Sequence, residues 1–184
     1  MWYPSTVTEA PPVEPVTLEQ AKQQCGILSA ETYFDAKINF LIKAARSHAE
    51  EYCNARWAEQ TIVSECDSFA DFERLSEGPL KSVTSISYVD PAGETQTVDA
   101  AVYEAHKDGL EPSIGLKSGQ VWPHILLGSR ITLTAVYGGS VPESVAHAML
   151  LFIADAFHRR ENSRQEDWTV LDALLCNHRR GASW

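Results

Sequence analysis

Residues 145–157 read VAHAMLLFIADAF, and this stretch decides the fold because the rest of the chain has to cover it. Its apolar run predicts a helix, and only His147 and Asp155 among its thirteen residues are polar. Such a helix has no wide polar face for solvent, so several of its sides must pack against other elements. A chain of this size supplies part of that cover, and we expect a neighbouring subunit to supply the rest.

Segments upstream of this apolar helix are expected to pack against part of its surface. Between residues 32 and 57, apolar side chains recur every three or four positions, which predicts a long amphipathic helix. Its apolar set is Phe34, Ile38, Leu41, Ile42, Ala45, Ala49, Tyr52 and Cys53. A shorter helix precedes it, because Thr17 and Gln20 form a T-x-x-Q capping box and Gly26 is a natural terminator. Residues 1–15 contain four prolines, which indicates an extended arm that packs on another surface or stays mobile.

Between the helices, residues 61–137 change to short β-branched and aromatic runs separated by turn residues, which is typical of antiparallel strands. The sequence Asp90-Pro91-Ala92-Gly93 suits a type I turn closed by glycine, so the strands on either side should form a hairpin. The expected strands are 83–89 and 94–98 around that turn, a weaker pair at 102–106 and 114–116, and an alternating strand at 131–137. The chain is therefore predicted to be an α+β protein with an antiparallel β-rich insertion.

Helix is expected again after the last strand. Ser140 and Glu143 form an S-x-x-E capping box, and the apolar helix should run to about Arg160. A terminal helix follows, with one stripe of Trp168, Leu171, Leu174, Leu175 and His178. This stripe is ordinary core packing if it folds back on its own chain, or a docking helix for another subunit or partner. The spacing of its apolar residues leaves both interpretations open.

Composition narrows the functional classes. The 184 residues are 44% hydrophobic and 22% charged, which is typical of a folded domain with room for a sizeable insertion. The net charge of −10 disfavours tight binding to a nucleic-acid backbone. It suits a solvated protein, a cation binder or the wall of a channel through which a polyanion slides. The four cysteines lack zinc-site spacing and indicate buried thiols in a reducing cytoplasm, and we expect no secretory signal or membrane span.

Motifs of nucleotide-binding proteins, metalloproteases and serine hydrolases are absent from the sequence. Cys53 with His48, or Cys66 with Asp67, has the residue types of a nucleophile and its base, yet nothing positions an oxyanion site beside either pair. Trp122 is interpreted as part of a loop that closes the β core. One group has the residue types of a metal site, although satisfied polar groups at a helix interface and a solvated helix end explain it better: His147, Asp155, His158 and Glu161. We therefore expect no catalytic, metal or cofactor site.

The order of the segments resembles a known family. The runs that carry the resemblance are PVTLEQAK at 15–22, INFLIKAARSHAEEY at 38–52, QT at 60–61, GPLKSVTSISYV at 78–89 with the DPAGETQT hairpin after it, SGQVWP at 118–123, ITLTAVYGG at 131–139 and VPESVAHAMLLFIADAFHRRE at 141–161. In this order and spacing they resemble the head-to-tail connector, or adaptor, proteins of long-tailed bacteriophages and gene transfer particles. The likeness covers residues 15–161.

The resemblance implies a helical connector core with a β-rich insertion, assembled as a twelve-subunit homo-oligomeric ring beneath the portal protein of a DNA-filled head. Such a ring extends the channel for double-stranded DNA without binding it tightly, and it offers a platform for tail-completion or tail-terminator proteins. The protein would be a structural virion component of the head–tail interface, made in the host bacterial cytoplasm, without catalytic residues.

On this interpretation the chain divides into an extended Pro-rich arm (1–15), a connector domain (16–161, with its insertion at about 61–138) and a C-terminal docking helix and tail (162–184). The expected partner-binding residues are Trp168, Leu171, Leu174, Leu175, His178, Arg179, Arg180 and Trp184. The expected subunit-interface residues are Met149, Leu150, Phe152, Ile153 and Phe157. The alternatives are a small metal-dependent hydrolase and a monomeric binding module.

Overall fold

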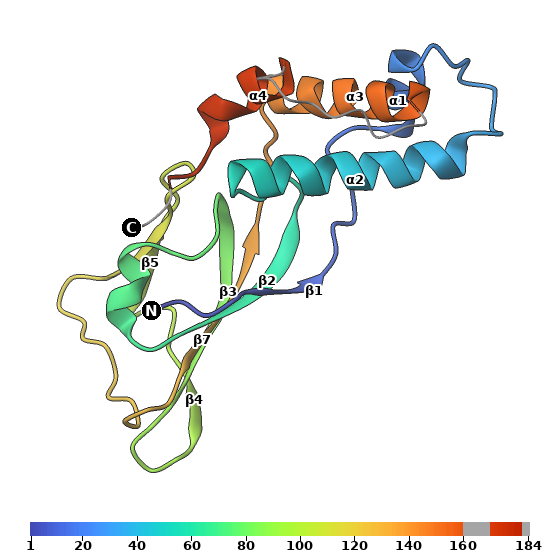
Figure 1. Ribbon diagram of the computed structural model, residues 1–184. Coiled ribbons are helices and arrows are strands. Elements are labelled where there is room, and N and C mark those ends of the chain that lie inside the picture. The colour runs from blue at the N-terminus through green and yellow to red at the C-terminus, as the bar shows by residue number, and fades with distance from the viewer. Residues whose placement is uncertain (160–169, 182–184) are drawn as a thin grey trace. The chain divides into compact units, whose positions relative to one another are not determined.

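The computed structural model describes residues 1–159 and 170–181 and divides the chain into two compact units (Figure 1). The β unit comprises Met1–Pro12 and Glu59–Gly139, and the helical unit comprises Val13–Ala58 and Ser140–Trp184. Each unit is therefore built from two stretches that are far apart in the sequence. The combination of helices with antiparallel sheets confirms the α+β class.

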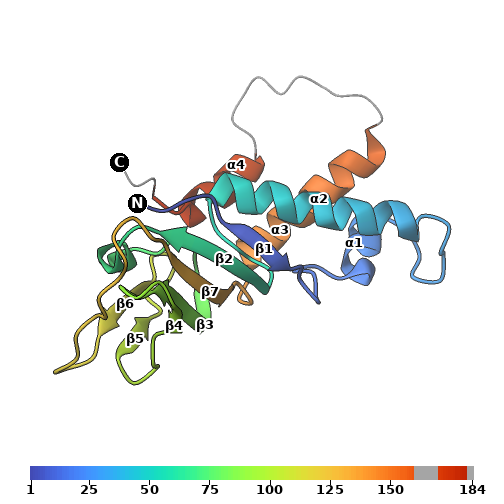
Figure 2. The same cartoon turned by 90° about the horizontal axis from the view of Figure 1, so that it is seen from below.

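The β unit is built on a five-stranded antiparallel sheet of order β1-β2-β7-β3-β4. Its strands are Thr6–Glu9 (β1), Gln60–Cys66 (β2), Leu80–Val89 (β3), Thr95–Thr97 (β4) and Ile131–Tyr137 (β7). β2 and β7 bury every second residue, so their buried side chains share one face of the sheet. Figure 2 shows β2 and β7 side by side within this sheet, with β3 beyond β7.

A two-stranded sheet and a short 3-10 helix complete the β unit. β5 (Tyr103–His106) pairs with β6 (Ser113–Leu116), and η1 spans Phe69–Glu73. η1 begins with a capping box in which Ser68 and Asp71 exchange side-chain to backbone hydrogen bonds. The core of the unit consists of Ile62, Cys66, Phe69, Phe72, Leu75, Leu80, Ile86, Val98, Ile114, Ile131, Leu133, Ala135 and Tyr137.

The helical unit contains the apolar segment 145–157, which forms most of α3. Its elements are α1 (Leu18–Gln24), α2 (Asp35–Cys53), α3 (Glu143–His158), α4 (Val170–Leu175) and the 3-10 turn η2 (Cys176–His178). α3 contacts α1, α2 and α4, so much of its apolar surface is covered within the chain. The buried residues of α2 recur at three- and four-residue spacing: Ile38, Leu41, Ile42, Ala45, Ala49, Glu50 and Cys53.

Short sequence patterns correctly predicted several of these elements. The capping box of Thr17 and Gln20 is confirmed at the start of α1. The hairpin between β3 and β4 is also confirmed, with the Gly93 N–H donating to the Asp90 carbonyl at 2.9 Å. β7 matches the predicted strand 131–137, and the weaker predicted pair corresponds to β5 and β6. In the described part of the chain, no helix combines the length and apolar character needed to cross a membrane.

The predicted capping box of Ser140 and Glu143 is wrong. The N-cap of α3 is Pro142, which makes no side-chain capping hydrogen bond, and Glu143 is already the first helical residue. Proline suits a helix start because its φ is fixed and it has no N–H that needs a partner. The predicted helix at residues 32–57 is shorter than expected, since α2 ends at Cys53 and Asn54 follows in the left-handed region with a φ of 50°.

Candidate interaction surfaces

A buried lysine holds the loop between α1 and α2. The side chain of Lys22 is 5% exposed and forms an ion pair with Asp35 Oδ1 at 2.5 Å. Its Nζ also donates to the backbone carbonyls of Ser29 and Glu31 at 3.3 and 2.7 Å. A buried ammonium group is tolerated only with such partners, so these contacts give the loop a defined shape. The loop nevertheless exposes a large apolar side chain, Leu28, to solvent.

A buried carboxylate organises the end of α2. The Glu50 side chain is 3% exposed, and its Oε2 lies 3.1 Å from Arg46 Nη1 and 3.8 Å from Arg56 Nη1. Its Oε1 accepts the backbone N–H groups of Trp57 and Ala58 at 3.0 and 3.2 Å. One side chain therefore satisfies two backbone donors and two guanidinium groups where the chain turns out of α2.

Two of the five expected subunit-interface residues are core residues of their own chain. Met149 and Ile153 are 1% and 0% exposed, because α3 packs on the other helices through them. Leu150, Phe152 and Phe157 are only partly buried and keep surface for a neighbour. The surface that α3 offers is therefore narrower than its apolar sequence suggests.

Aromatic side chains gather where the start of α2 meets the end of α3. The Phe157 ring is edge-on to Phe34 with the centroids 5.3 Å apart, and Phe34 is edge-on to Tyr33 at 4.8 Å. Lys37 Nζ lies 4.3 Å from the Phe157 ring centroid and donates to the Phe157 carbonyl at 3.1 Å. Tyr33 is exposed, so this aromatic cluster reaches the surface of the helical unit.

The C-terminal segment packs on the helical unit at defined points. Leu175 and Arg180 are buried, and the Arg180 N–H donates to the Cys53 carbonyl at 2.7 Å. The Arg179 guanidinium lies 5.4 Å from the centroid of the Tyr52 ring. The other expected partner-binding residues that the structure describes are partly buried: Leu171, Leu174 and His178. Trp168 and Trp184 lie outside the described residues.

A serine and a histidine meet where η2 reaches the start of α3, which the sequence did not predict. Ser144 Oγ lies 2.6 Å from Nε2 of His178, whose ring is edge-on to Trp57 at 6.1 Å. Nucleophilic catalysis would also need an acidic group that orients the ring and an oxyanion site. No carboxylate among the described residues hydrogen-bonds to the His178 ring. The pair thus fastens the C-terminal segment to α3.

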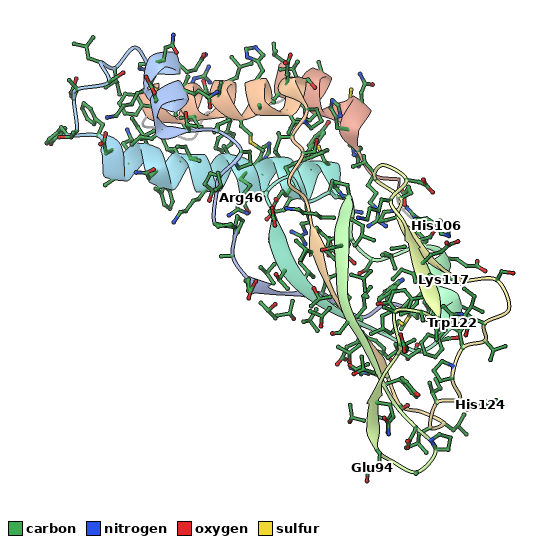
Figure 3. All side chains as sticks on the ribbon, turned by 180° about the vertical axis from the view of Figure 1, so that it is seen from behind. Arg46, Glu94, His106, Lys117, Trp122 and His124 are labelled. Atoms are coloured by element: carbon green, nitrogen blue, oxygen red, sulfur yellow. The ribbon has the colours of Figure 1, made fainter. Side chains whose placement is uncertain are left out.

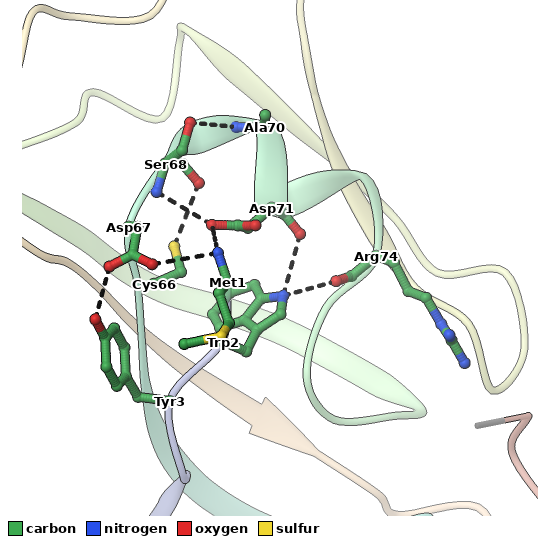
Figure 4. A network of polar contacts seen from close by, with 9 residues as sticks. All are labelled: Met1, Trp2, Tyr3, Cys66, Asp67, Ser68, Ala70, Asp71 and Arg74. Carbon is green, nitrogen blue, oxygen red and sulfur yellow. Dashed lines mark hydrogen bonds and ion pairs between the residues drawn. The ribbon is translucent and has the colours of Figure 1, made fainter. Parts of the chain in front are cut away.

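The first residues of the chain are anchored on the β unit (Figure 4). The indole Nε1 of Trp2 donates to the carbonyls of Asp71 and Arg74 at 3.1 and 2.8 Å. The N-terminal ammonium group forms an ion pair with the Asp71 carboxylate at 2.6 Å. The Tyr3 hydroxyl donates to Asp67 Oδ1 at 2.8 Å and holds the pKa of Asp67 below its usual value. β1 follows directly and pairs with β2, so the expected extended arm forms the edge of the sheet.

The hypothetical nucleophiles are buried thiols. Burial raises the pKa of Cys53 to about 11 and that of Cys66 to about 12, so neither is a thiolate at neutral pH. His48 stacks on Phe152 with the ring centroids 5.2 Å apart, and Asp67 accepts the hydrogen bond described above. Neither pair suggested by the sequence is therefore arranged for nucleophilic attack.

In the native chain before assembly, at mildly alkaline pH, we expect a thiol reagent to label Cys176 before the other cysteines. Cys176 is partly exposed, whereas Cys25, Cys53 and Cys66 are buried and burial raises the pKa of each. Denaturation should then make all four thiols reactive, which mass spectrometry of the labelled chain measures. Native labelling of Cys53 at the rate of Cys176 would contradict the burial.

The group with metal-site residue types is not assembled in the described residues. His147 is exposed on α3, and Asp155 Oδ1 pairs with Arg159 Nε at 2.8 Å. Glu161 lies outside the described residues. Across residues 1–159 and 170–181, no three His, Cys, Asp or Glu side chains are placed to hold a metal ion.

Trp122 anchors the long loop between β6 and β7. Its ring is parallel to that of Phe69, with the centroids 4.5 Å apart, and edge-on to Phe72 at 5.7 Å. Figure 3 shows Trp122 among the crowded side chains of the β unit. The interpretation of Trp122 as part of a loop that closes the β core is therefore confirmed.

Solved structures share this fold. No family model and no curated protein matches the sequence. A chain in the neck of an empty gene transfer agent (GTA) particle, computed with C6 symmetry, matches with a TM-score of 0.82 and 19% identity, over 99% of this chain and 98% of that chain. A chain of the native GTA virion matches with a TM-score of 0.80 and 20% identity, over 98% and 97% of the two chains. A chain in the native GTA neck, computed with C12 symmetry, matches with a TM-score of 0.70 and 22% identity, over 97% of this chain and 97% of that chain.

The chain has the fold of a GTA neck protein. The resemblance to connector proteins, based on residues 15–161, is confirmed at the level of fold. The match to the neck fold also extends beyond those residues, since it covers nearly the whole chain.

Within the neck fold, sequence reasoning missed the contacts that join distant segments. Trp2 on the η1 carbonyls and Ser144 on His178 are examples, because each pair is separated by dozens of residues. One weak signal was available for the Trp2 contact: Trp2 and Tyr3 are large aromatic side chains at the start of a Pro-rich segment, and burying them is favourable.

Proposed function

We propose that this chain is a structural head-to-tail connector subunit of a virion neck and that it acts without catalysis. The observation that carries the proposal is the fold match to a GTA neck chain at a TM-score of 0.82 over nearly the whole length of both chains. In this role the helical unit is the connector core, and the Glu59–Gly139 part of the β unit is its insertion between α2 and α3.

The subunits assemble as a closed ring, most simply of twelve copies. The matched neck structures were computed with C6 and C12 symmetry, and a twelve-fold ring is compatible with both. In a cyclic ring each subunit presents two different faces to its two neighbours. The partly buried apolar residues of α3, namely Leu150, Phe152 and Phe157, are the candidates for one of these faces.

The ring lies beneath the portal protein and extends the channel for double-stranded DNA towards a tail-completion or tail-terminator protein. The net charge of −10 supports this role, because a polyanion passes an acidic wall without the tight phosphate contacts that would stall it. The C-terminal segment, including Arg179 and Arg180, and the N-terminal residues are the candidate contacts with the portal and the tail.

Electron microscopy of the purified full-length chain tests the proposal, alone and after mixing with portal-bearing heads. We expect rings with a central hole, or a twelve-fold collar on the portal, and light scattering should give the corresponding mass. A chain that stays monomeric at all concentrations and also fails to join portal-bearing heads would contradict the proposed function.

We expect Leu171→Asp to impair assembly while leaving the folded core largely intact. Leu171 is partly buried on α4 and keeps apolar surface for a partner, which an added carboxylate would disrupt. Leu175→Ala is the matched comparison on the same helix. Leu175 is 1% exposed, so its truncation should lower the free energy of unfolding by about 2–5 kcal/mol. Thermal melting and collar formation measure the two effects, and loss of cooperative melting in Leu171→Asp would show that Leu171 belongs to the core.

A further inference from the structure

The loop between β6 and β7 contains a braced turn that is formed by Leu126–Ser129. The Ser129 N–H donates to the Leu126 carbonyl at 3.0 Å, and the Ser129 hydroxyl donates to the same carbonyl at 2.8 Å. Gly128, the third residue, has the positive φ of 81° that a type II turn requires. The Leu126 N–H donates to the Val89 carbonyl at 2.9 Å, which ties the turn to the end of β3.

This turn displays apolar surface that the β unit does not use. Leu127 is 99% exposed, and Leu126 is 40% exposed. Leu127 occupies the second position of the turn, where the backbone accepts most residue types, so the local structure does not require a leucine. Burying it against a partner is favourable, and a braced turn loses little conformational entropy on binding.

The β3–β4 hairpin, to which the turn is tied through Val89, carries acidic groups. The Val89 carbonyl that holds the turn belongs to β3, and Figure 3 shows Glu94 at the tip of the hairpin. Glu94 is exposed, and its carboxylate makes no hydrogen bond or ion pair with any residue the structure describes. The Asp90 carboxylate accepts the N–H groups of Ala92 and Glu94 at 2.9 and 3.0 Å, and these hydrogen bonds hold the pKa of Asp90 below its usual value. The β unit therefore offers an apolar tip, with Asp90 directly after the residue that holds it and the Glu94 carboxylate on the other side of β3.

The outer side of α2 carries the complementary surface. Phe40 is 69% exposed, and Lys37 and Lys43 lie three residues before and after it, on the same side of the helix. Lys43 has no hydrogen bond or ion pair with a described residue, although the chain as a whole is acidic. The exposed Phe40 ring lies beside the unpaired Lys43 ammonium group, whereas the Lys37 ammonium group is held at the Phe157 ring and carbonyl. This face matches an apolar tip near carboxylates in both polarity and charge.

We propose that the Leu127 turn of one subunit docks on the Lys37–Phe40–Lys43 face of a second copy of this chain. The inference rests on the proposed ring, because a contact between two different faces of identical subunits is the kind that closes into a ring. Charge complementarity selects the second copy, since this chain itself carries both the apolar tip near carboxylates and the basic, aromatic face.

Charge reversal tests the proposal in the full-length chain. We expect Glu94→Lys and Lys43→Glu each to raise the concentration at which half of the chain is assembled, by about tenfold. The double variant should recover most of the wild-type assembly, because it restores opposite charges across the contact. Leu127→Asp should impair assembly strongly, whereas Val121→Asp, in the same loop and similarly exposed at 79%, should not. Circular dichroism confirms that each variant is folded.

A photo-crosslinking residue at Leu127 locates the docked surface directly. In rings mixed from isotope-labelled and unlabelled subunits, the cross-linked product should join two copies and contain the tryptic peptide 38–43, which includes Phe40. If Leu127→Asp forms rings of wild-type mass, or if the residue at position 127 cross-links only to a tail protein, the proposed docking contact is wrong. The proposed ring would still hold in either case. Failure of the wild-type chain to form rings or collars at all would instead contradict the proposed function.

Discussion

Glu50→Ala is expected to lower the free energy of unfolding by about 3–5 kcal/mol. The substitution leaves the guanidinium groups of Arg46 and Arg56 without their shared carboxylate and removes the acceptor of the Trp57 and Ala58 N–H groups. Arg46 keeps its ion pair with Glu14 at 2.8 Å, so the loss comes mainly from the two buried backbone donors that are left unsatisfied, at about 1–3 kcal/mol each. Urea denaturation followed by circular dichroism measures the change.

Two further variants of α2 test whether the loss of stability comes from the buried carboxylate of Glu50. Glu50→Gln keeps an oxygen for the two backbone donors and should lose less stability than Glu50→Ala, although its charge is gone. Glu51→Ala removes the neighbouring, exposed carboxylate and should change the free energy of unfolding by no more than about 0.5 kcal/mol. A loss below about 1 kcal/mol in Glu50→Ala would mean that the turn after α2 does not depend on this side chain.

Phe72→Ala should also cost about 3–5 kcal/mol, in the core of the β unit. Phe72 is 0% exposed and lies at the centre of an aromatic cluster, with ring centroids 5.8 Å from Trp2 and 5.7 Å from both Phe69 and Trp122. Truncation removes the ring on which three others pack, and the neighbouring backbone cannot collapse fully into the space. Denaturation monitored by tryptophan fluorescence measures the loss.

Tyr33→Ala is the matched control for an aromatic truncation. Tyr33 is 84% exposed, so its removal should change the free energy of unfolding only slightly. Equal losses in the two variants would contradict the placement of Phe72 in the core and Tyr33 at the surface.

Features that depend on neighbouring residues were predictable from sequence. The capping box of Thr17 and Gln20 involves residues three positions apart, and the turn at Asp90–Gly93 closes within four residues. The alternation of 131–137 reflects one buried face of a strand. In each case the physical cause lies within a few residues of its effect, so a single sequence contains it.

Features that depend on distant partners were not predictable. β1 is exposed at all four residues, three of them polar, and it is a strand only because β2, more than fifty residues away, supplies its hydrogen bonds. η1 depends likewise on the burial of Phe69 and Phe72 in a core assembled from several strands. The error at Ser140 has a different cause, since Pro142 begins α3 without a side-chain cap.

The apolar stretch at 145–157 shows what the sequence alone predicts and what depends on the tertiary structure. By itself the sequence determined that this stretch is a helix, that it must be covered, and that the chain is an α+β protein with the segment order of connector proteins. Only the tertiary structure decided that α1, α2 and α4 bury Met149 and Ile153 and leave Leu150, Phe152 and Phe157 partly exposed. The physical reason is that hydrophobicity is a property of each side chain, whereas exposure depends on which distant segments pack against it.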